Sequence, residues 1–143
     1  LDLYLGPCQV QHVRPAPDEA PDTPIRPEDL PHPITQPRLL LATGSFPDPT
    51  TWTNHFRPCH PDLIDACADA GVRLIGVDTP SVDGATDAAL PSHQRCLARA
   101  VCILEGLVLR DVPDGIYELI ALPLPLAGFD ASPVRAVLRA WEG

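Results

Sequence analysis

The chain has 143 residues, about the length of one domain, and 45% of them are hydrophobic, which is enough to bury a core. The formal net charge is −9 and the ten basic residues are spread along the chain, which argues against a nucleic-acid surface. No apolar run approaches the ~20 residues of a membrane span, and no secretory signal opens the sequence. Five Cys residues without metal-type spacing indicate a reducing compartment, so we expect a cytoplasmic protein that does not bind membranes.

Apolar runs separated by glycine and proline predict short strands along the chain. These strands are expected over residues 1–5, 8–13, 38–43, 72–77, 101–109, 117–126 and 132–141. Two helices are expected, over residues 61–70 and 91–100. The first is the clearer one, because Pro61 suits the first helical position and Gly71 suits the position after the last turn. We interpret residues 1–143 as a single α/β domain.

Two segments are predicted to be long connections. Residues 14–37 are dense in proline, which excludes a central strand and a long helix. We expect a solvated connection there, with at most one helical turn beginning at Pro27. Residues 44–56 are polar but contain aromatic side chains, which we expect to pin this loop to the body of the protein.

The loop after the strand at 72–77 holds polar residues that are candidates for a functional site. Asp78, Thr79 and Ser81 leave the carboxyl end of that strand, where loops of α/β folds often carry function. For Asp78 the alternative is a hydrogen bond that only shapes the turn.

A single carboxylate, Glu105, lies in the apolar run that follows the second helix. An ionised carboxylate in such a run is costly unless a cation, a proton or several hydrogen bonds compensate it. If the helix ends near residue 100, the chain doubles back and brings His93 close to Glu105. We therefore predict that His93 and Glu105 form half of a divalent-metal site. The alternative is a structural carboxylate that pairs with Arg95 or Arg99.

Several stretches, taken together, resemble the bacterial kynurenine formamidase (arylformamidase) branch of the cyclase-like metal-dependent hydrolases. They are LDLYLGPCQV (1–10), HPDLIDACADAGVRLIGVDTPSVD (60–83), LPSH (90–93), ILEGLVL (103–109), VPDGIYELIALPLPL (112–126) and DASPVRAVLRA (130–140). The resemblance implies a swivelling β/β/α fold with a mixed sheet, a homodimer and a zinc-type site. It also implies hydrolysis of N-formyl-L-kynurenine to L-kynurenine and formate in tryptophan degradation.

The resemblance assigns two residues as metal ligands. The His of the family's L-P-x-H motif falls on His93, and the Glu of its I-L-E-G motif falls on Glu105. One His and one Glu suit zinc and manganese alike, so manganese stays open beside zinc. Two departures concern the loop and helix near this site: Gln94 replaces a common second His, and Asp87-Ala88 replaces a common Ser-Lys.

The family's main motif, H-x-G-T-H-x-D-x-P-x-H, is absent from this sequence. It holds the other ligands and the acid/base His, so no catalytic residue is assigned here. The chain also lacks Met, so we expect it to be the C-terminal part of a longer protein and inactive by itself. The alternatives are an isatin-hydrolase-like enzyme, another cyclase-family amidase, or a noncatalytic remnant of the fold.

Overall fold

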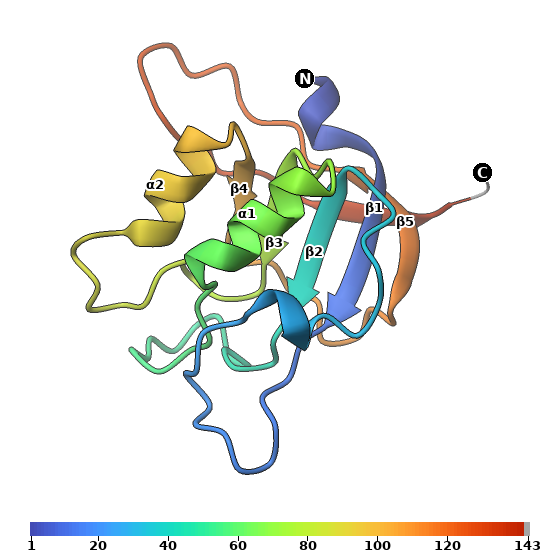
Figure 1. The fold of residues 1–143 in the computed structure, drawn as a ribbon. Helices are drawn as coiled ribbons and strands as arrows, with labels where there is room; N and C mark the ends of the chain where they lie inside the picture. The colour runs from blue at the N-terminus through green and yellow to red at the C-terminus, as the bar shows by residue number, and fades with distance from the viewer. Residues whose placement is uncertain (142–143) are drawn as a thin grey trace.

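A six-stranded mixed sheet forms the centre of the protein, as the computed structural model of residues 1–141 shows (Figure 1). Its strand order is β4-β3-β2-β1-β5-β6. The strands are β1 (Leu5–His12), β2 (Arg38–Ala42), β3 (Leu74–Val77), β4 (Cys102–Leu104), β5 (Gly115–Ile120) and β6 (Val137–Ala140). Strands β1 to β4 are parallel, whereas β5 and β6 pair antiparallel. The mixed α/β architecture predicted from the sequence is confirmed.

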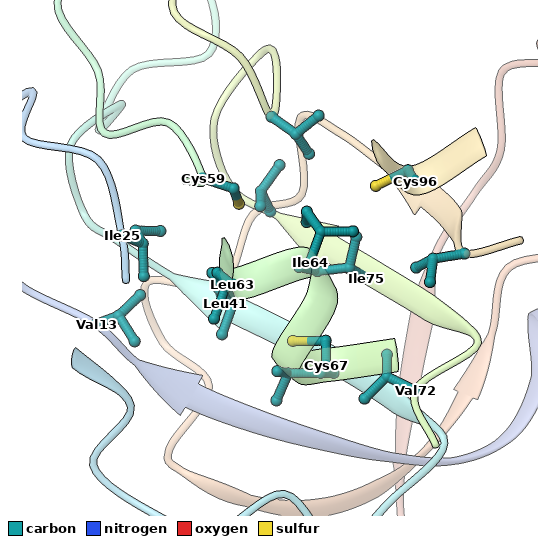
Figure 2. Packing of buried hydrophobic residues seen from close by; sticks show 14 residues of the cluster. Val13, Ile25, Leu41, Cys59, Leu63, Ile64, Cys67, Val72, Ile75 and Cys96 are labelled. Atoms are coloured by element: carbon teal, nitrogen blue, oxygen red, sulfur yellow. The ribbon is translucent and has the colours of Figure 1, made fainter. Parts of the chain in front are cut away.

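Two helices cover one face of this sheet (Figure 1). Helix α1 (Pro61–Asp69) has Pro at its first position, and the His60 ring accepts a hydrogen bond from the Asp62 amide as a cap. Helix α2 (Pro91–Ala98) runs beside it. The apolar side chains of α1 pack on alternate residues of β2 and β3 in one buried cluster, labelled in part in Figure 2: Leu39, Leu41, Leu63, Ile64, Cys67 and Ile75.

The other residues of the same strands form a second cluster on the opposite face. It contains Cys8, Val10, Leu40, Leu74 and Leu119, and the C-terminal segment packs against it. This packing is tight at Gly76, where an added Cβ would lie 2.5 Å from a Leu40 methyl carbon and 2.8 Å from a Leu107 one. The central strands are therefore buried on both faces, as their continuous apolar runs predict.

The proline-rich segment 14–37 is mostly exposed and holds no named strand and only one helical turn, so the predicted surface connection is confirmed. Hydrogen bonds to the sheet, which were not predicted, fix part of its backbone. Two buried glutamines of β1 bind its backbone: Gln9 accepts from the Thr35 amide at 2.9 Å, and Gln11 exchanges bonds of 3.2 and 3.1 Å with the His32 backbone. These bonds tie exposed residues of the segment to buried side chains of β1. The predicted helical turn is present as the 3₁₀ turn Pro27–Asp29.

The far end of the same segment is fixed by two buried side chains. Ile25 is fully buried and forms a parallel bridge with Cys59. Arg57 is also fully buried; its guanidinium donates to the Val13 and Thr23 carbonyls and pairs with Asp29 at 2.7 Å. A buried cation of this kind is stable only with such complete pairing.

The first residues differ from the prediction of two strands with a break. Residues Asp2–Tyr4 form a 3₁₀ turn, and β1 then runs without interruption through Gly6 and Pro7. The cause is Arg38, whose guanidinium donates to the carbonyl groups of Asp2, Leu3 and Pro7. Pairing with β5 keeps β1 continuous across Gly6.

Two later strands are shorter than predicted. β4 ends at Leu104, so Glu105 does not lie inside a strand; Gly106, at φ +69°, turns the chain directly after it. β5 leaves the sheet after Ile120, before the prolines that exclude further pairing, and only Val137–Ala140 of the predicted last strand pairs. Within residues 1–141 no helix combines the length and the apolar character needed to cross a membrane.

Candidate metal site

The candidate site lies at the edge of the sheet where the parallel strands end. Asp78 directly follows β3 and Glu105 directly follows β4. Helix α2 packs beside β4, and its third residue, His93, faces the same edge. The carboxyl ends of parallel strands are the usual place for ligand sites in α/β folds.

The structure brings His93 and Glu105 together. His93 Nε2 lies 3.4 Å from Glu105 Oε1, and both side chains are about one-third exposed. Two ligands bound at ~2.0–2.1 Å with tetrahedral angles lie about 3.4 Å apart, so this spacing fits two adjacent positions on one cation. Glu105 Oε1 also accepts from the Val82 amide at 2.9 Å, which fixes the carboxylate at the edge.

The structural alternative for Glu105 is wrong. Arg95 and Arg99 reach the opposite side of α2, where both pair with Asp65 of α1; the Arg99–Asp65 distance is 2.9 Å. Arg99 also pairs with Asp69. Glu105 therefore has no arginine partner among residues 1–141 and faces His93 instead.

Asp83 is a site residue that the sequence reasoning missed. Its carboxylate is 2% exposed and accepts from His93 Nδ1 at 2.7 Å, from the His93 amide at 2.9 Å and from the Ser92 amide at 2.8 Å. Burial alone would raise the pKa of Asp83, but the hydrogen bonds from His93 and Ser92 outweigh it and lower the pKa. The carboxylate is thus held ionised behind the ring.

A signal for Asp83 is present in the sequence of α2. The residue at the N-cap of this helix is Leu90, in left-handed conformation at φ 48°, and a leucine side chain cannot accept hydrogen bonds. The Ser92 hydroxyl donates to the Cys59 carbonyl instead of capping. The first amides of α2 therefore need an acceptor from elsewhere in the chain, and Asp83 supplies it.

The three predicted loop residues shape the edge. Asp78 accepts from the Thr43 amide and hydroxyl at 3.0 and 2.6 Å and from the Gly44 amide at 2.9 Å, so it ties the ends of β2 and β3 together. The Thr79 hydroxyl donates to the Ser81 carbonyl, and the Ser81 hydroxyl accepts from an amide of the same loop. Their polar atoms are engaged in holding the backbone.

A cavity of about 180 Å³ opens at the same edge. Its lining is mostly apolar and comes from the 44–49 loop and from residues 107–109, with Asp78 and Arg110 as the charged members. Leu107 is two residues from Glu105, and its amide donates to the Val77 carbonyl at 3.1 Å. Some residues that line the cavity therefore follow Glu105 closely in the sequence.

Residues 1–141 contain no cluster of three or more His, Cys, Asp or Glu side chains placed to hold a metal ion. The described part of the chain thus offers two ligands, His93 and Glu105, whereas a catalytic zinc usually has three protein ligands. The donor types and the spacing fit such an ion, and the remaining positions would require further groups. The assignment of both residues as ligands stays a prediction.

No known family model matches the chain. Among solved structures, a potential metal-dependent hydrolase with cyclase activity superposes with a TM-score of 0.81 at 30% identity, covering 96% of this chain and 66% of that one. A predicted metal-dependent hydrolase from Bacillus stearothermophilus gives the same score and identity, with 65% of its chain covered. Isatin hydrolase A from Labrenzia aggregata, at 20% identity, gives a TM-score of 0.77 with 62% of its chain covered.

The fold is therefore that of the cyclase-like metal-dependent hydrolases. These similarities support the broader part of the family resemblance, a metal-dependent hydrolase of the cyclase-like type. The isatin hydrolase agrees with the same fold. The chain spans 62–66% of the length of these structures, so the activity of the whole protein is a matter for proposal.

Proposed function

We propose that the protein to which this chain belongs is a metal-dependent arylformamidase that hydrolyses N-formyl-L-kynurenine to L-kynurenine and formate. The observation that carries the proposal is the 3.4 Å approach of His93 Nε2 to Glu105 Oε1 at the strand ends. The fold supports it, since it is shared with metal-dependent hydrolases at 30% identity.

In this proposal His93 and Glu105 hold the ion and Asp83 orients His93. A divalent metal at this position supplies the Lewis acidity that activates water and polarises a formyl carbonyl. Glu105 offsets part of the ion's charge, and its contact with the Val82 amide keeps it in place during turnover. The acid that protonates the leaving aniline nitrogen is assigned, by the family resemblance, to a motif that this sequence does not contain. Zinc is the proposed ion, and manganese is the alternative that the donor set also suits.

The cavity lined by residues 107–109, which follow Glu105 in the chain, supports an aromatic substrate that carries a carboxylate. Its apolar wall suits an aromatic ring, and Arg110 offers a positive charge. None of the ion pairs within residues 1–141 involves Arg110. N-formylkynurenine has both an arene and a carboxylate, whereas isatin is a neutral lactam, so the cavity favours the first over the alternative.

The test uses the product of the complete gene, stripped of metal with a chelator and reloaded with zinc or manganese. We expect hydrolysis of N-formylkynurenine, followed by absorbance, that is lost on chelation and restored by one of the two ions. A kcat/KM for isatin larger than that for N-formylkynurenine would replace the proposal by its alternative. No hydrolysis of either compound, with metal bound, would favour a noncatalytic remnant.

We propose two further properties from the resemblance. The protein forms a homodimer, which light scattering after gel filtration would measure, and it acts in the cytoplasm, which fractionation of the cells would test. The 143-residue chain alone should show little formamidase activity, because it supplies only two of the expected ligands. Turnover by the chain alone close to that of the complete protein would contradict this expectation.

A further inference from the structure

We infer that Asp83 is the positioning residue that sets the tautomer of His93, so that Nδ1 carries the ring proton and Nε2 is left bare toward Glu105. The part of the inference that concerns a metal rests on the proposed function. The part that concerns the tautomer rests on the geometry of this chain alone.

The first step concerns the carboxylate. Two backbone N–H groups and the Nδ1 atom of the His93 ring converge on Asp83, and the side chain is 2% exposed. An ionised carboxylate accepts hydrogen bonds and donates none. Its partner at 2.7 Å, His93 Nδ1, must therefore be the donor.

The second step concerns the opposite side of the ring. A neutral imidazole has one N–H, so a proton on Nδ1 leaves a lone pair on Nε2. This nitrogen lies 3.4 Å from Glu105 Oε1, which is also an acceptor. In the neutral ring these two acceptors repel each other, so the position between them favours a cation or a proton. A ligand histidine commonly donates its other N–H to a carboxylate.

The third step explains why Asp83 sets the ring orientation firmly. The same carboxylate binds the Ser92 and His93 amides, which are the amides that the Leu90 N-cap leaves without an acceptor. The start of α2 and the His93 ring therefore share one anchor. Any rotation of the ring away from Asp83 would leave a buried carboxylate short of a donor, which is costly.

The chain contains an internal reference for the test. His60 Nδ1 lies 3.2 Å from the Asp62 amide and 3.3 Å from the Asp62 carboxylate, and this histidine is not a partner of Asp83. Its tautomer should therefore be the same in wild type and in the Asp83 variants. A property of the solvent or the pH would act on both, whereas Asp83 acts on His93 alone.

The experiment is nitrogen NMR of the ring atoms in the 15N-labelled 143-residue chain, without metal and at alkaline pH, where imidazoles are neutral. We expect wild-type His93 to carry the proton on Nδ1. In Asp83→Ala the acceptor at Nδ1 is gone and Glu105 remains beside Nε2, so the His93 proton should move to Nε2 while His60 stays unchanged. Asp83→Glu should restore the wild-type His93 pattern, because it restores an ionised acceptor.

The control variant is Asp65→Asn, which removes a carboxylate that bridges the two helices but does not contact His93. It should lower the melting temperature and leave both tautomers unchanged, so a merely structural effect is distinguished. Wild-type His93 with its proton on Nε2 would overturn the inference, and this outcome needs no variant to fold. An unchanged His93 pattern in Asp83→Ala would overturn it as well.

A second readout concerns the metal. In the complete protein, Asp83→Ala should weaken zinc binding by about 10–100-fold, which is typical of lost partners of ligand histidines. Titration with zinc alone measures this, and it does not depend on which substrate is hydrolysed. If wild type and Asp83→Ala bind zinc equally while the His93 tautomer differs, the ligand role is overturned, and the arylformamidase proposal is left to its own assay.

Discussion

The protein has two histidine–aspartate contacts beside the ends of parallel strands, and they are built differently. Near the end of β4, Asp83 is 2% exposed and binds both the ring and the backbone amide of His93. The second ring nitrogen of His93 faces Glu105. At the end of β1, Asp114 is 31% exposed and its two oxygens go to different rings, His12 and His32. The first arrangement presents a free nitrogen to a carboxylate, whereas the second shares one carboxylate between two partly exposed histidines.

The difference shows that residue types alone do not make a ligand site. His32 lies 3.3 Å from one oxygen of Asp114, while His12 contacts the other with its ring and its amide. Asp114 therefore joins β1, the proline-rich segment and the turn before β5 at the surface. We interpret Asp114 as a surface contact that holds these three segments together, and we call it the Asp114 clasp. We interpret Asp83 as the residue that orients His93, the proposed metal ligand. The predictions below separate these two roles.

The largest effect is expected from Glu105→Gln in the complete protein. The change keeps the size of the side chain but removes the charge that a cation needs, so zinc affinity and activity should fall at least about 100-fold. Without metal, the melting temperature should stay equal or rise slightly, because the variant no longer places a partly buried negative charge at position 105. Metal analysis and calorimetry measure both quantities.

The matched control is Glu118→Gln on β5, where the carboxylate pairs with Arg139 on the other side of β1. Its zinc affinity should equal that of wild type. Unchanged zinc occupancy in Glu105→Gln with a lower melting temperature would remove Glu105 from the ligand set.

The second effect compares the two aspartates directly. Asp83→Ala should lower the free energy of unfolding by about 2–3 kcal/mol, because two buried amides and a ring nitrogen lose a charged acceptor. Asp114→Ala should cost less than about 1 kcal/mol, since its partners reach water. Urea unfolding of the chain measures both, and equal losses would show that the two contacts do not differ in kind.

The third effect concerns the cavity lined by Arg110 and residues 107–109. Arg110→Gln should raise KM for N-formylkynurenine about tenfold with little change in kcat, because a binding charge is lost and the ligands are untouched. Arg135→Gln, an exposed arginine of the C-terminal segment, is the control and should leave KM unchanged. A kcat loss with KM constant would place Arg110 outside substrate binding.

The sequence predicted the parts of this fold that local signals determine. Helix α1 was placed by Pro61 and Gly71, and the approach of His93 to Glu105 followed from a short helix that turns back into β4. The end of β4 before Glu105 was not predicted, because a three-residue strand has too few residues for a periodic pattern.

The missed features depend on partners that are distant in the sequence. Asp83 acts as the acceptor for amides nine and ten residues away, and cap rules search only the residue before a helix. Gln9 and Gln11 bind the backbone of a segment more than twenty residues away, and its proline content predicted the exposed connection but not these bonds. Both omissions have the same cause. A hydrogen-bond partner can come from any part of the chain, whereas a sequence pattern describes only neighbouring residues.

The smallest effect is the pH dependence of the Asp114 clasp. Burial would raise the pKa of Asp114, but hydrogen bonds from the His12 ring and amide, together with the charges of His12 and His32, lower it below its ordinary value of 3.8. A carboxylate with a lowered folded-state pKa adds stability above its unfolded pKa and loses it as the pH falls through the folded value. The stability difference between wild type and Asp114→Asn should therefore shrink as the pH falls below 3.8. Urea unfolding of both proteins across this range measures it, and the total change should stay below about 1 kcal/mol because the pair is partly exposed. A difference that grows as the pH falls would show that the carboxylate is destabilised in the folded protein, and the clasp would then be wrong.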